Sequence, residues 1–409
     1  MRNRWVYVIV GFVMNVCLGT VYSWSVFRPP LHKPPFGLSP AESILPFSLF
    51  LLFFGVMFSL SGLAVSKYGP RRTALIGAIL VGLGYLFSSL ISVSQGLCLP
   101  ILLLGFGAMA GTGCAFAYNP PIATSGRWFP DKRGLALGLT VMGFGLSSLF
   151  TAPLVATLVG NLGISQTFVA VGLVFLATLF LLGSTLKFPA SDWKAPAKVE
   201  VAAKAELDFG TREMLGTSTF YVSWLVYLIG AGSGLAIIGY AKQIALDVTR
   251  LPDSTATLVV SLLAVSNAVG RPAFGKIVDA AGPKKALALN ALLQLVSLLV
   301  FMPMSSNPAF LLIGIILLGA TFGAYLAVMP ALISYFYGTK NLGPNYGICF
   351  SAYGMGGIIM PVVVSSLLGP GPTYAPEDYA RAFYAMGAMV ALSFALSALM
   401  RPVLKKAQA

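Results

Sequence analysis

Charge is scarce in this sequence, since Asp, Glu, Lys and Arg together make up only 9% of its 409 residues. Soluble domains carry nearer a quarter charged residues, so an ordinary soluble enzyme is excluded. Histidine and cysteine are scarcer still: His32 is the one histidine, and the four cysteines are widely spaced. The sequence offers no cluster typical of a metal or redox site, and we expect no metal, no cofactor and no enzymatic activity.

Hydrophobic residues make up 57% of the chain, and its mean hydropathy is +0.86. A helix that crosses the bilayer needs about 20 apolar residues, so this composition predicts an all-α membrane protein. The uninterrupted apolar stretches predict twelve transmembrane helices, at residues 5–27, 43–66, 72–94, 97–127, 135–160, 166–188, 217–241, 254–278, 284–304, 309–334, 345–368 and 379–400.

The one long polar connection follows the sixth predicted helix, at residues 189–213, and is rich in charge. A hydrated cytoplasmic linker explains this composition. We therefore expect two six-helix bundles, formed by residues 1–188 and residues 214–409.

Lysine and arginine concentrate in alternate connections between the predicted helices. With the N-terminus inside, 20 of the 26 basic residues fall in inner loops and tails, and Arg271 lies within a helix. This bias follows the positive-inside rule, so we expect both termini in the cytoplasm and a multi-pass protein of a prokaryotic inner membrane. This topology explains the excess of basic over acidic residues, so the excess does not indicate a nucleic-acid partner. The five bases predicted in outer connections are Arg28, Lys33, Lys242, Arg250 and Arg381.

A loop element is repeated in the two halves of the sequence. Its glycine, its Gly-Pro turn and its basic pair recur with a constant offset of 213 residues. Such a repeat is typical of secondary transporters, whose substrate site lies between two similar halves. The two copies are Gly62, Gly69-Pro70 and Arg71-Arg72, and Gly275, Gly282-Pro283 and Lys284-Lys285.

Both copies resemble the loop signature of the major facilitator superfamily, which carries an acidic residue before the turn. Asp279 keeps that acid in the second copy, whereas Ser66 replaces it in the first. The resemblance implies the major facilitator fold, with two pseudo-symmetric bundles. It also implies that an inner gate is held by Asp279, Arg71, Arg72 and Lys284.

Three further stretches narrow the resemblance. Residues 19–31 are similar to the first helix of the oxalate/formate antiporter family, and residues 127–139 to a fifth-helix entry shared with the monocarboxylate transporters. Residues 267–275 resemble the eighth helix of the monocarboxylate transporters. The resemblance implies transport of small carboxylates, and it places Tyr22 and Tyr325 among the residues that line the substrate site.

Arg271 is the deepest basic residue of the predicted helices. A charge at such depth is costly unless it faces a water-filled path or a partner, and a guanidinium matches a carboxylate. We predict that Arg271 binds the carboxylate of the substrate, with snorkelling toward the nearby membrane surface as the alternative.

Asn267 precedes Arg271 by four residues and so shares its helix face. It is predicted to hold the guanidinium or a substrate hydroxyl, or else to bond a neighbouring helix. The monocarboxylate transporters usually carry Asp here, as the proposed proton partner of the arginine.

A single deep cation favours a monoanion, because the predicted helices hold no Asp or Glu near mid-depth. A dianion such as oxalate would need a second base. In the oxalate/formate antiporter family, which this chain resembles, the oxalate transporter has a lysine of the eleventh helix for this purpose, at the position where this chain has Tyr353. A neutral phenol suits a monocarboxylate. Lactate fits well, and pyruvate, acetate, glycolate and formate remain open.

Tyr118 and Asn119 precede two prolines within the fourth predicted helix. Prolines free backbone carbonyls, which is tolerated at depth where protein or water satisfies them. We therefore expect this segment to line the cavity, with Tyr118 bonding the carboxylate.

These features predict a secondary carrier of small monocarboxylates such as L-lactate, monomeric and coupled to protons, working by alternating access. Anion exchange of the oxalate/formate type is the alternative. A drug-efflux pump shares the fold, but such pumps typically transport lipophilic cations, which a buried acidic residue binds better than a buried arginine. A membrane enzyme needs clustered His, Asp or Cys, which the sequence lacks.

Overall fold

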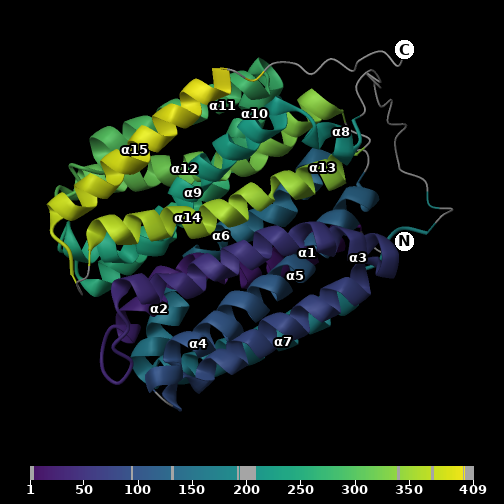
Figure 1. Cartoon of the computed structure of the whole chain (residues 1–409). Coiled ribbons are helices and arrows are strands. Elements are labelled where there is room, and N and C mark those ends of the chain that lie inside the picture. Colours follow the sequence, from purple (N-terminus) through teal and green to yellow (C-terminus); the bar gives the residue numbers. More distant parts are fainter. Residues whose placement is uncertain are drawn as a thin grey trace.

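The computed structural model of the chain is built from helices throughout the part that it describes, residues 4–93, 95–129, 133–190, 193, 209–338, 341–369, 373–398 and 400 (Figure 1). The first half contains α1 (Trp5–Leu18), η1 (Gly19–Ser23), α2 (Trp24–Leu31), α3 (Pro40–Ser88), η2 (Ser89–Ser92), η3 (Gln95–Leu97), α4 (Cys98–Leu102), η4 (Leu103–Ala110), α5 (Gly111–Trp128), α6 (Arg133–Leu162) and α7 (Ile164–Ser184). The second half contains α8 (Thr211–Leu215), α9 (Ser218–Asp247), α10 (Asp253–Ala281), α11 (Pro283–Val296), η5 (Ser297–Phe301), α12 (Pro308–Tyr337), α13 (Leu342–Cys349), α14 (Ser351–Leu368) and α15 (Pro376–Ala398).

Eleven helices of the described residues are long and apolar enough to cross a membrane. The sequence predicts twelve. The difference arises because α3 and η2 form one continuous span, Pro40–Ser92, which covers the predicted helix 43–66 and most of the predicted helix 72–94. Its helical path breaks at Gly69, where φ is 82°. Glycine adopts this conformation without strain, and Pro70 then starts the next helical turn with its fixed φ.

The predicted linker is described only near its two ends, since residues 191–192 and 194–208 lie outside the described residues. Its last part is attached to the second half of the chain. The backbone N–H of Phe209 donates to the carbonyl of Tyr337 at 3.0 Å, and the Asn345 amide donates to the carbonyl of Phe209 at 3.1 Å. These bonds fix where the chain enters α8.

Small residues bring helices of the same half into close contact. A Cβ added to Gly77 would lie 2.4 Å from the backbone nitrogen of Ala117, and one added to Gly270 would lie 2.1 Å from the carbonyl oxygen of Ala320. Backbones that approach this closely gain the van der Waals contact on which helix association in a membrane depends. Gly270 thereby fixes α10 against α12, directly beside Arg271.

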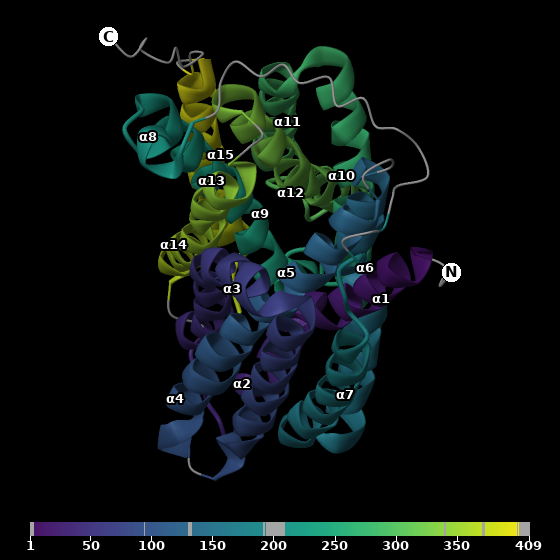
Figure 2. The same cartoon turned by 90° about the vertical axis from the view of Figure 1, so that its right-hand side faces the viewer.

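The helices of residues 5–184 and those of residues 218–398 lie on opposite sides of the molecule (Figures 1 and 2). The two halves meet where α3 packs on α14 and where α6 packs on α10. A Cβ added to Gly55 of α3 would lie 2.6 Å from the backbone of Gly354 in α14. A Cβ added to Gly145 of α6 would lie 3.3 Å from the backbone of Ala268 in α10. The interface therefore depends on small residues at its closest points.

The contact between α6 and α10 ends part of the way along the two helices. Gly138 and Gly275 lie seven residues, about two turns, beyond Gly145 and Ala268, toward the end of the molecule that contains the turn at Gly69. A Cβ added to either glycine would meet no heavy atom within 4 Å. The two helices thus separate toward this end, which we call the Gly69 end.

The opposite end, which contains the turn at Gly163, is closed between the halves. We call it the Gly163 end. A Cβ added to Gly239 of α9 would lie 2.8 Å from Ile44 and 3.3 Å from Phe47, both of α3. The two halves are therefore packed together at the Gly163 end. Toward the Gly69 end α6 and α10 are apart, whereas α13 still contacts α3, where a Cβ added to Gly347 would lie 3.1 Å from the hydroxyl of Ser59.

Two of the five bases expected in outer connections are instead helical and buried. Arg28 lies in α2 and is 2% exposed, and Lys242 lies in α9 and is 4% exposed. The sequence pattern misplaces them because each follows an apolar run without a break. Lys242 pairs with Asp253 of α10 at 2.9 Å, and the partners of Arg28 are described below.

Candidate functional site

Arg271 lies between the two halves of the chain. It belongs to α10, and its guanidinium packs on α6, where a Cβ added to Gly145 would lie 3.3 Å from its Cζ and Nη2 atoms. Its Nη1 atom donates to the carbonyl oxygen of Val141 at 2.8 Å, and the residue is only 7% exposed. Arg271 therefore spans the interface at the level where α6 and α10 begin to separate.

Asn267 lies one helical turn from Arg271, as their spacing predicts. Its Oδ1 atom accepts from Nε and Nη2 of Arg271, each at 3.4 Å, which is long for a hydrogen bond to a guanidinium. Asn267 is fully buried, and its Nδ2 atom has no hydrogen-bond partner among the described residues. Leaving such a donor unpaired costs about 1–3 kcal/mol, so this amide is a ready donor for a bound acceptor.

The positive charge of Arg271 has no nearby counterion in the described part of the chain, where no carboxylate lies within 4.0 Å of its guanidinium. A guanidinium carries five N–H donors in a planar fork, and here the Val141 carbonyl, the Asn267 amide oxygen and the Tyr118 hydroxyl are its hydrogen-bond partners. The arrangement can accept one carboxylate through two parallel hydrogen bonds. No three His, Cys, Asp or Glu residues within the described ranges gather as metal ligands would.

Tyr118 and Asn119 lie next to each other in α5 but contact different neighbours. Tyr118 is half-buried and close enough to Arg271 to interact electrostatically with it, and its ring packs edge-on against Phe144 at 5.2 Å. Asn119 instead donates from Nδ2 to the hydroxyl of Ser61 in α3, at 3.0 Å. Of the two, the structure brings Tyr118 to Arg271.

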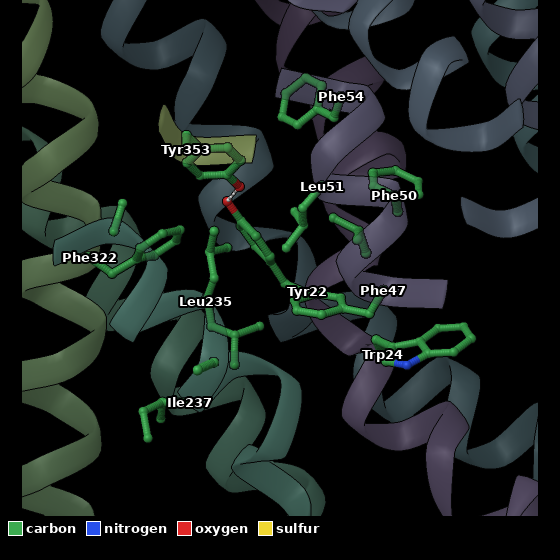
Figure 3. Close-up of a cluster of buried hydrophobic side chains, with 14 of the residues drawn as sticks. Tyr22, Trp24, Phe47, Phe50, Leu51, Phe54, Leu235, Ile237, Phe322 and Tyr353 are labelled. Atoms are coloured by element: carbon green, nitrogen blue, oxygen red, sulfur yellow. Dashed lines mark hydrogen bonds between the residues drawn. The ribbon is translucent and has the colours of Figure 1, made fainter. Parts of the chain in front are cut away.

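Tyr22 and Tyr353 meet across the interface between the halves (Figure 3). Their hydroxyl oxygens lie 2.9 Å apart, and both side chains are buried. Tyr22 comes from η1, where the chain passes from α1 to α2, and it lies close enough to Arg271 for an electrostatic interaction. The tyrosine pair therefore joins the halves near Arg271.

Phenylalanine rings surround these tyrosines, and no pattern in the sequence separates them from ordinary core residues. Phe54 packs against Tyr118 at 5.4 Å and Tyr353 at 6.0 Å. Phe322 packs against Tyr22 at 5.6 Å, on the side opposite Phe54 in Figure 3. Such rings exclude water from the polar groups they surround, which strengthens electrostatic interactions among them.

Two further residues near Arg271 are absent from the sequence-based prediction. Val141 contributes only a backbone carbonyl, so its side chain carries no signal. Tyr346 of α13 lies within electrostatic range of Arg271, and its hydroxyl is 3.4 Å from that of Tyr227. A tyrosine in a short segment between two glycines gives no periodic pattern from which its position could be predicted.

Tyr325 belongs to the second half of the chain, and its hydroxyl bonds within that half. It is fully buried in α12, and its hydroxyl donates to Oε1 of Gln294 in α11 at 3.0 Å. Gly230 of α9 makes room for its ring, because a Cβ there would lie 2.1 Å from the phenol. The structure does not bring Tyr325 together with Arg271.

The predicted gate residues lie at the Gly69 end. Arg71, Arg72 and Asp279 are exposed, and within the described ranges none of them has an oppositely charged partner within 4.0 Å. Lys284 donates to the carbonyl oxygen of Met400 at 2.8 Å. This arrangement accompanies the separation of the halves at the same end.

The chain matches the model of the Major Facilitator Superfamily over residues 5–305 and, in a second match, residues 224–409. It is 28% identical over 357 residues to the oxalate:formate antiporter of Oxalobacter formigenes, with 86% of this chain and 81% of that protein covered. It is 29% identical over 301 residues to monocarboxylate transporter 13 of Rattus norvegicus, with 72% and 66% covered. The predicted resemblance to both groups of transporters is confirmed.

The fold is similar to that of solved transporters. The crystal structure of a D-xylose-proton symporter superposes with a TM-score of 0.73 at 15% identity, covering 96% of this chain and 97% of that one. At this identity the likeness concerns the fold alone. Given eleven apolar helices long enough to cross a membrane, a buried arginine between two packed halves, and these family matches, the chain is a multi-pass membrane transporter, not an enzyme, and belongs to the major facilitator superfamily.

Proposed function

We propose that the protein is a secondary active transporter of small monocarboxylates such as L-lactate, and that Arg271 binds the carboxylate. The observation that carries this proposal is the burial of the Arg271 guanidinium between the halves, without a carboxylate within 4.0 Å among the described residues. A cation in that position is costly to enclose alone. A bound carboxylate neutralises it, which favours closure around the substrate.

Binding requires the Arg271 fork to exchange a protein partner for the substrate. The short bond from Nη1 to the Val141 carbonyl crosses from α10 to α6. A carboxylate that displaces this carbonyl can accept from Nη1 and Nη2, while the free Asn267 amide and Tyr118 supply further donors. Substrate binding then changes a contact between the two halves, as coupling of transport to binding requires.

The neutral surroundings of Arg271 favour a monoanion as substrate. Tyr22, Tyr118 and Tyr353 are phenols, and Asn267 is an amide, so one fixed positive charge faces the substrate. A dicarboxylate would bring a second negative charge without a partner into a buried site. A short apolar tail, such as the methyl group of lactate, is instead compatible with the rings of Phe54, Phe144 and Phe322, which pack against Tyr118 or Tyr22.

Coupling to protons is part of the proposal, although the arginine itself cannot carry the proton, because its pKa lies above 12. Asp247 of α9 is half-buried, and among the described residues it has no basic partner within 4.0 Å. It accepts from Gln243 at 2.8 Å and from the Tyr379 hydroxyl at 2.9 Å. We propose this carboxyl group as the proton site.

Anion exchange is the second candidate, and Asn267 favours it. An amide next to Arg271 does not titrate, so the arginine is neutralised by substrate in both directions of the cycle. The similarity to an oxalate:formate antiporter is consistent with exchange. Under this alternative, a substrate on each side replaces the proton. A drug-efflux pump finds less support, since the charge between the halves is positive.

The membrane arrangement that we propose has twelve crossings in two bundles, residues 1–188 and 214–409, joined by the cytoplasmic linker 189–213. The break at Gly69 divides α3 into two of these crossings. The Gly69 end carries the basic loops and lies in the cytoplasm by the positive-inside rule. The conformation is then inward-open, and its exposed Asp279, Arg71 and Arg72 are gate residues, with Lys284, that come together in the opposite state.

Purified protein in proteoliposomes tests this function. Uptake of labelled L-lactate is measured with an inward proton gradient and, separately, with unlabelled lactate preloaded inside. Stimulation by the proton gradient alone supports symport, and stimulation by preloaded anion alone supports exchange. A panel of acetate, formate, pyruvate, oxalate and a lipophilic cation defines the substrate class. Failure of every carboxylate to be transported or to compete overturns the proposal.

A further inference from the structure

Arg28 is a second buried cation, and neither the family match nor the proposed binding site gives it a role. It lies in α2 near the Gly163 end and is 2% exposed. No carboxylate of a described residue lies within 4.0 Å of it. A charge this deeply buried is retained only where its surroundings satisfy it, so its partners indicate what it stabilises.

The partners of Arg28 come from both halves of the chain. Its Nε donates to the hydroxyl of Ser43 at 3.1 Å, and its Nη2 to the carbonyl of Pro40 at 3.0 Å, both at the start of α3. Its Nη1 donates to the carbonyl of Gly239 in α9 at 3.2 Å, and its Cζ lies 4.2 Å from the ring centroid of Tyr240. The first two contacts stay within one half, whereas the last two cross to the other.

The cross-half contacts of Arg28 depend on the closed state of the Gly163 end. Gly239 reaches the guanidinium because it packs on Ile44 and Phe47 of α3, and this packing is lost if α9 moves away from α3. Opening would then remove from Arg28 a charge-assisted hydrogen bond and a cation–π contact. Both interactions therefore favour the closed end over the open one.

We propose that Arg28 is the latch of the Gly163 end, a residue that holds this end closed through Gly239 and Tyr240 and releases it during transport. The latch rests on the proposed alternating-access cycle but not on the identity of the substrate. Arg28 and Arg271 make the same kind of contact, since each guanidinium donates to a backbone carbonyl of the opposite half. The Arg28 contact lies near the Gly163 end, and the Arg271 contact lies at the level where α6 and α10 separate.

Lys242 provides a matched control. It is a buried base near the same end, yet its salt bridge with Asp253 joins α9 to α10 within the second half. Loss of this pair destabilises the second half, and among the described residues no hydrogen bond or ion pair of Lys242 crosses the interface. A latch predicts that Arg28 and Lys242 differ in their effect on opening, even if both affect stability.

Spin-label distance measurements on the full chain in nanodiscs test the latch. Cysteines replace Ala41 and Ser254, two exposed residues in different halves at the Gly163 end, after Cys17, Cys98, Cys114 and Cys349 are changed to serine. Loss of a hydrogen bond to a charged group changes a population ratio by about tenfold or more. We expect Arg28→Gln to raise the ratio of open to closed molecules by that factor, and Lys242→Gln to leave it unchanged.

Two further variants keep the test decisive if Arg28→Gln does not fold. Tyr240→Leu removes the ring and is expected to shift the ratio in the same direction, and Arg28→Lys keeps the charge and is expected to give a smaller shift. Unchanged distances in the folded Arg28 and Tyr240 variants overturn the latch, as does an equal shift in Lys242→Gln. The distances are recorded without substrate, so a failure of lactate transport leaves this result unaffected.

Discussion

The hydroxyl oxygens of Tyr22 and Tyr353 lie 2.9 Å apart, although 331 residues separate the two tyrosines in the chain. One comes from each half, so the hydrogen bond between them reports on the interface itself. Both phenols lie among buried aromatic rings (Figure 3), and Tyr22 is close enough to Arg271 for an electrostatic interaction. Around this tyrosine pair, the interface thus combines the permanent positive charge of Arg271 with uncharged hydrogen-bonding groups.

Replacing Tyr353 by Phe removes the hydroxyl and keeps the ring. A neutral hydrogen bond contributes about 0.5–1.5 kcal/mol, so we expect the half-saturation concentration for L-lactate uptake to rise roughly two- to tenfold. Tyr335→Phe is the control, because Tyr335 is 54% exposed and lies outside the interface. Equal half-saturation concentrations in wild type and Tyr353→Phe would place this hydroxyl outside the transport pathway.

Replacing Asn267 by Asp places a carboxylate about 3.4 Å from the Arg271 guanidinium. The ion pair satisfies the arginine, so the substrate then competes with the introduced carboxylate unless a proton neutralises that group. We expect uptake at pH 8 to fall at least about tenfold and to recover on acidification. Asn267→Ser, which adds no charge, is the control. Wild-type uptake by Asn267→Asp at pH 8 would contradict the proposed electrostatics.

Gly138 lies in open space on α6, and the inward-open assignment gives it a role when the Gly69 end closes. We expect Gly138→Leu to fold normally, because nothing lies within 4 Å, yet to slow lactate exchange at least about tenfold by obstructing closure. Gly160→Leu is the control, since Gly160 also has open space on the same helix. The readouts are thermal stability and exchange rate. Normal exchange by Gly138→Leu would mean that the two helices do not close there.

His32 lies just after α2 and is half-buried. Its burial, together with the nearby Arg28 cation, lowers the pKa of the imidazole below its usual 6.5, although a hydrogen bond with the Leu38 carbonyl opposes the shift. The unfolded chain takes up this proton near pH 6.5 and the folded chain only at lower pH. Stability is therefore full above about pH 6.5 and falls as the pH drops toward the lowered value.

Thermal unfolding in detergent measures this dependence. We expect the loss of stability between pH 7.5 and pH 5 to be smaller in His32→Asn than in the wild type, because other groups titrate equally in both. An identical loss in the two proteins would exclude His32 as a contributor.

Much of the fold follows from the sequence because apolar runs of membrane length leave few alternatives to a spanning helix. The boundary between the second and third predicted helices lies within α3, where Gly69 and Pro70 mark the break. The predicted positions of Arg28 and Lys242 are wrong, since an apolar run does not show where a charged side chain finds backbone carbonyls or an acidic partner.

The candidate site is only partly predictable. The spacing of Asn267 and Arg271 follows from helix geometry, and the structure brings them together with Tyr118, Tyr22 and Tyr353. Tyr325 points into its own half, because the partner that determines its direction, Gln294, lies on another helix. Contacts of this kind depend on which helices are neighbours in the fold. The residues around Tyr325 in the sequence do not show which helix will lie beside it.

The most direct test of the account is L-lactate uptake by Arg271→Lys in proteoliposomes, with the exposed Arg381→Lys as control. Lysine keeps the charge but loses the planar fork. The account predicts that uptake falls at least about tenfold in Arg271→Lys and stays at the wild-type level in Arg381→Lys. Uptake unchanged in Arg271→Lys, at equal amounts of folded protein, would contradict the claim that this arginine binds the substrate.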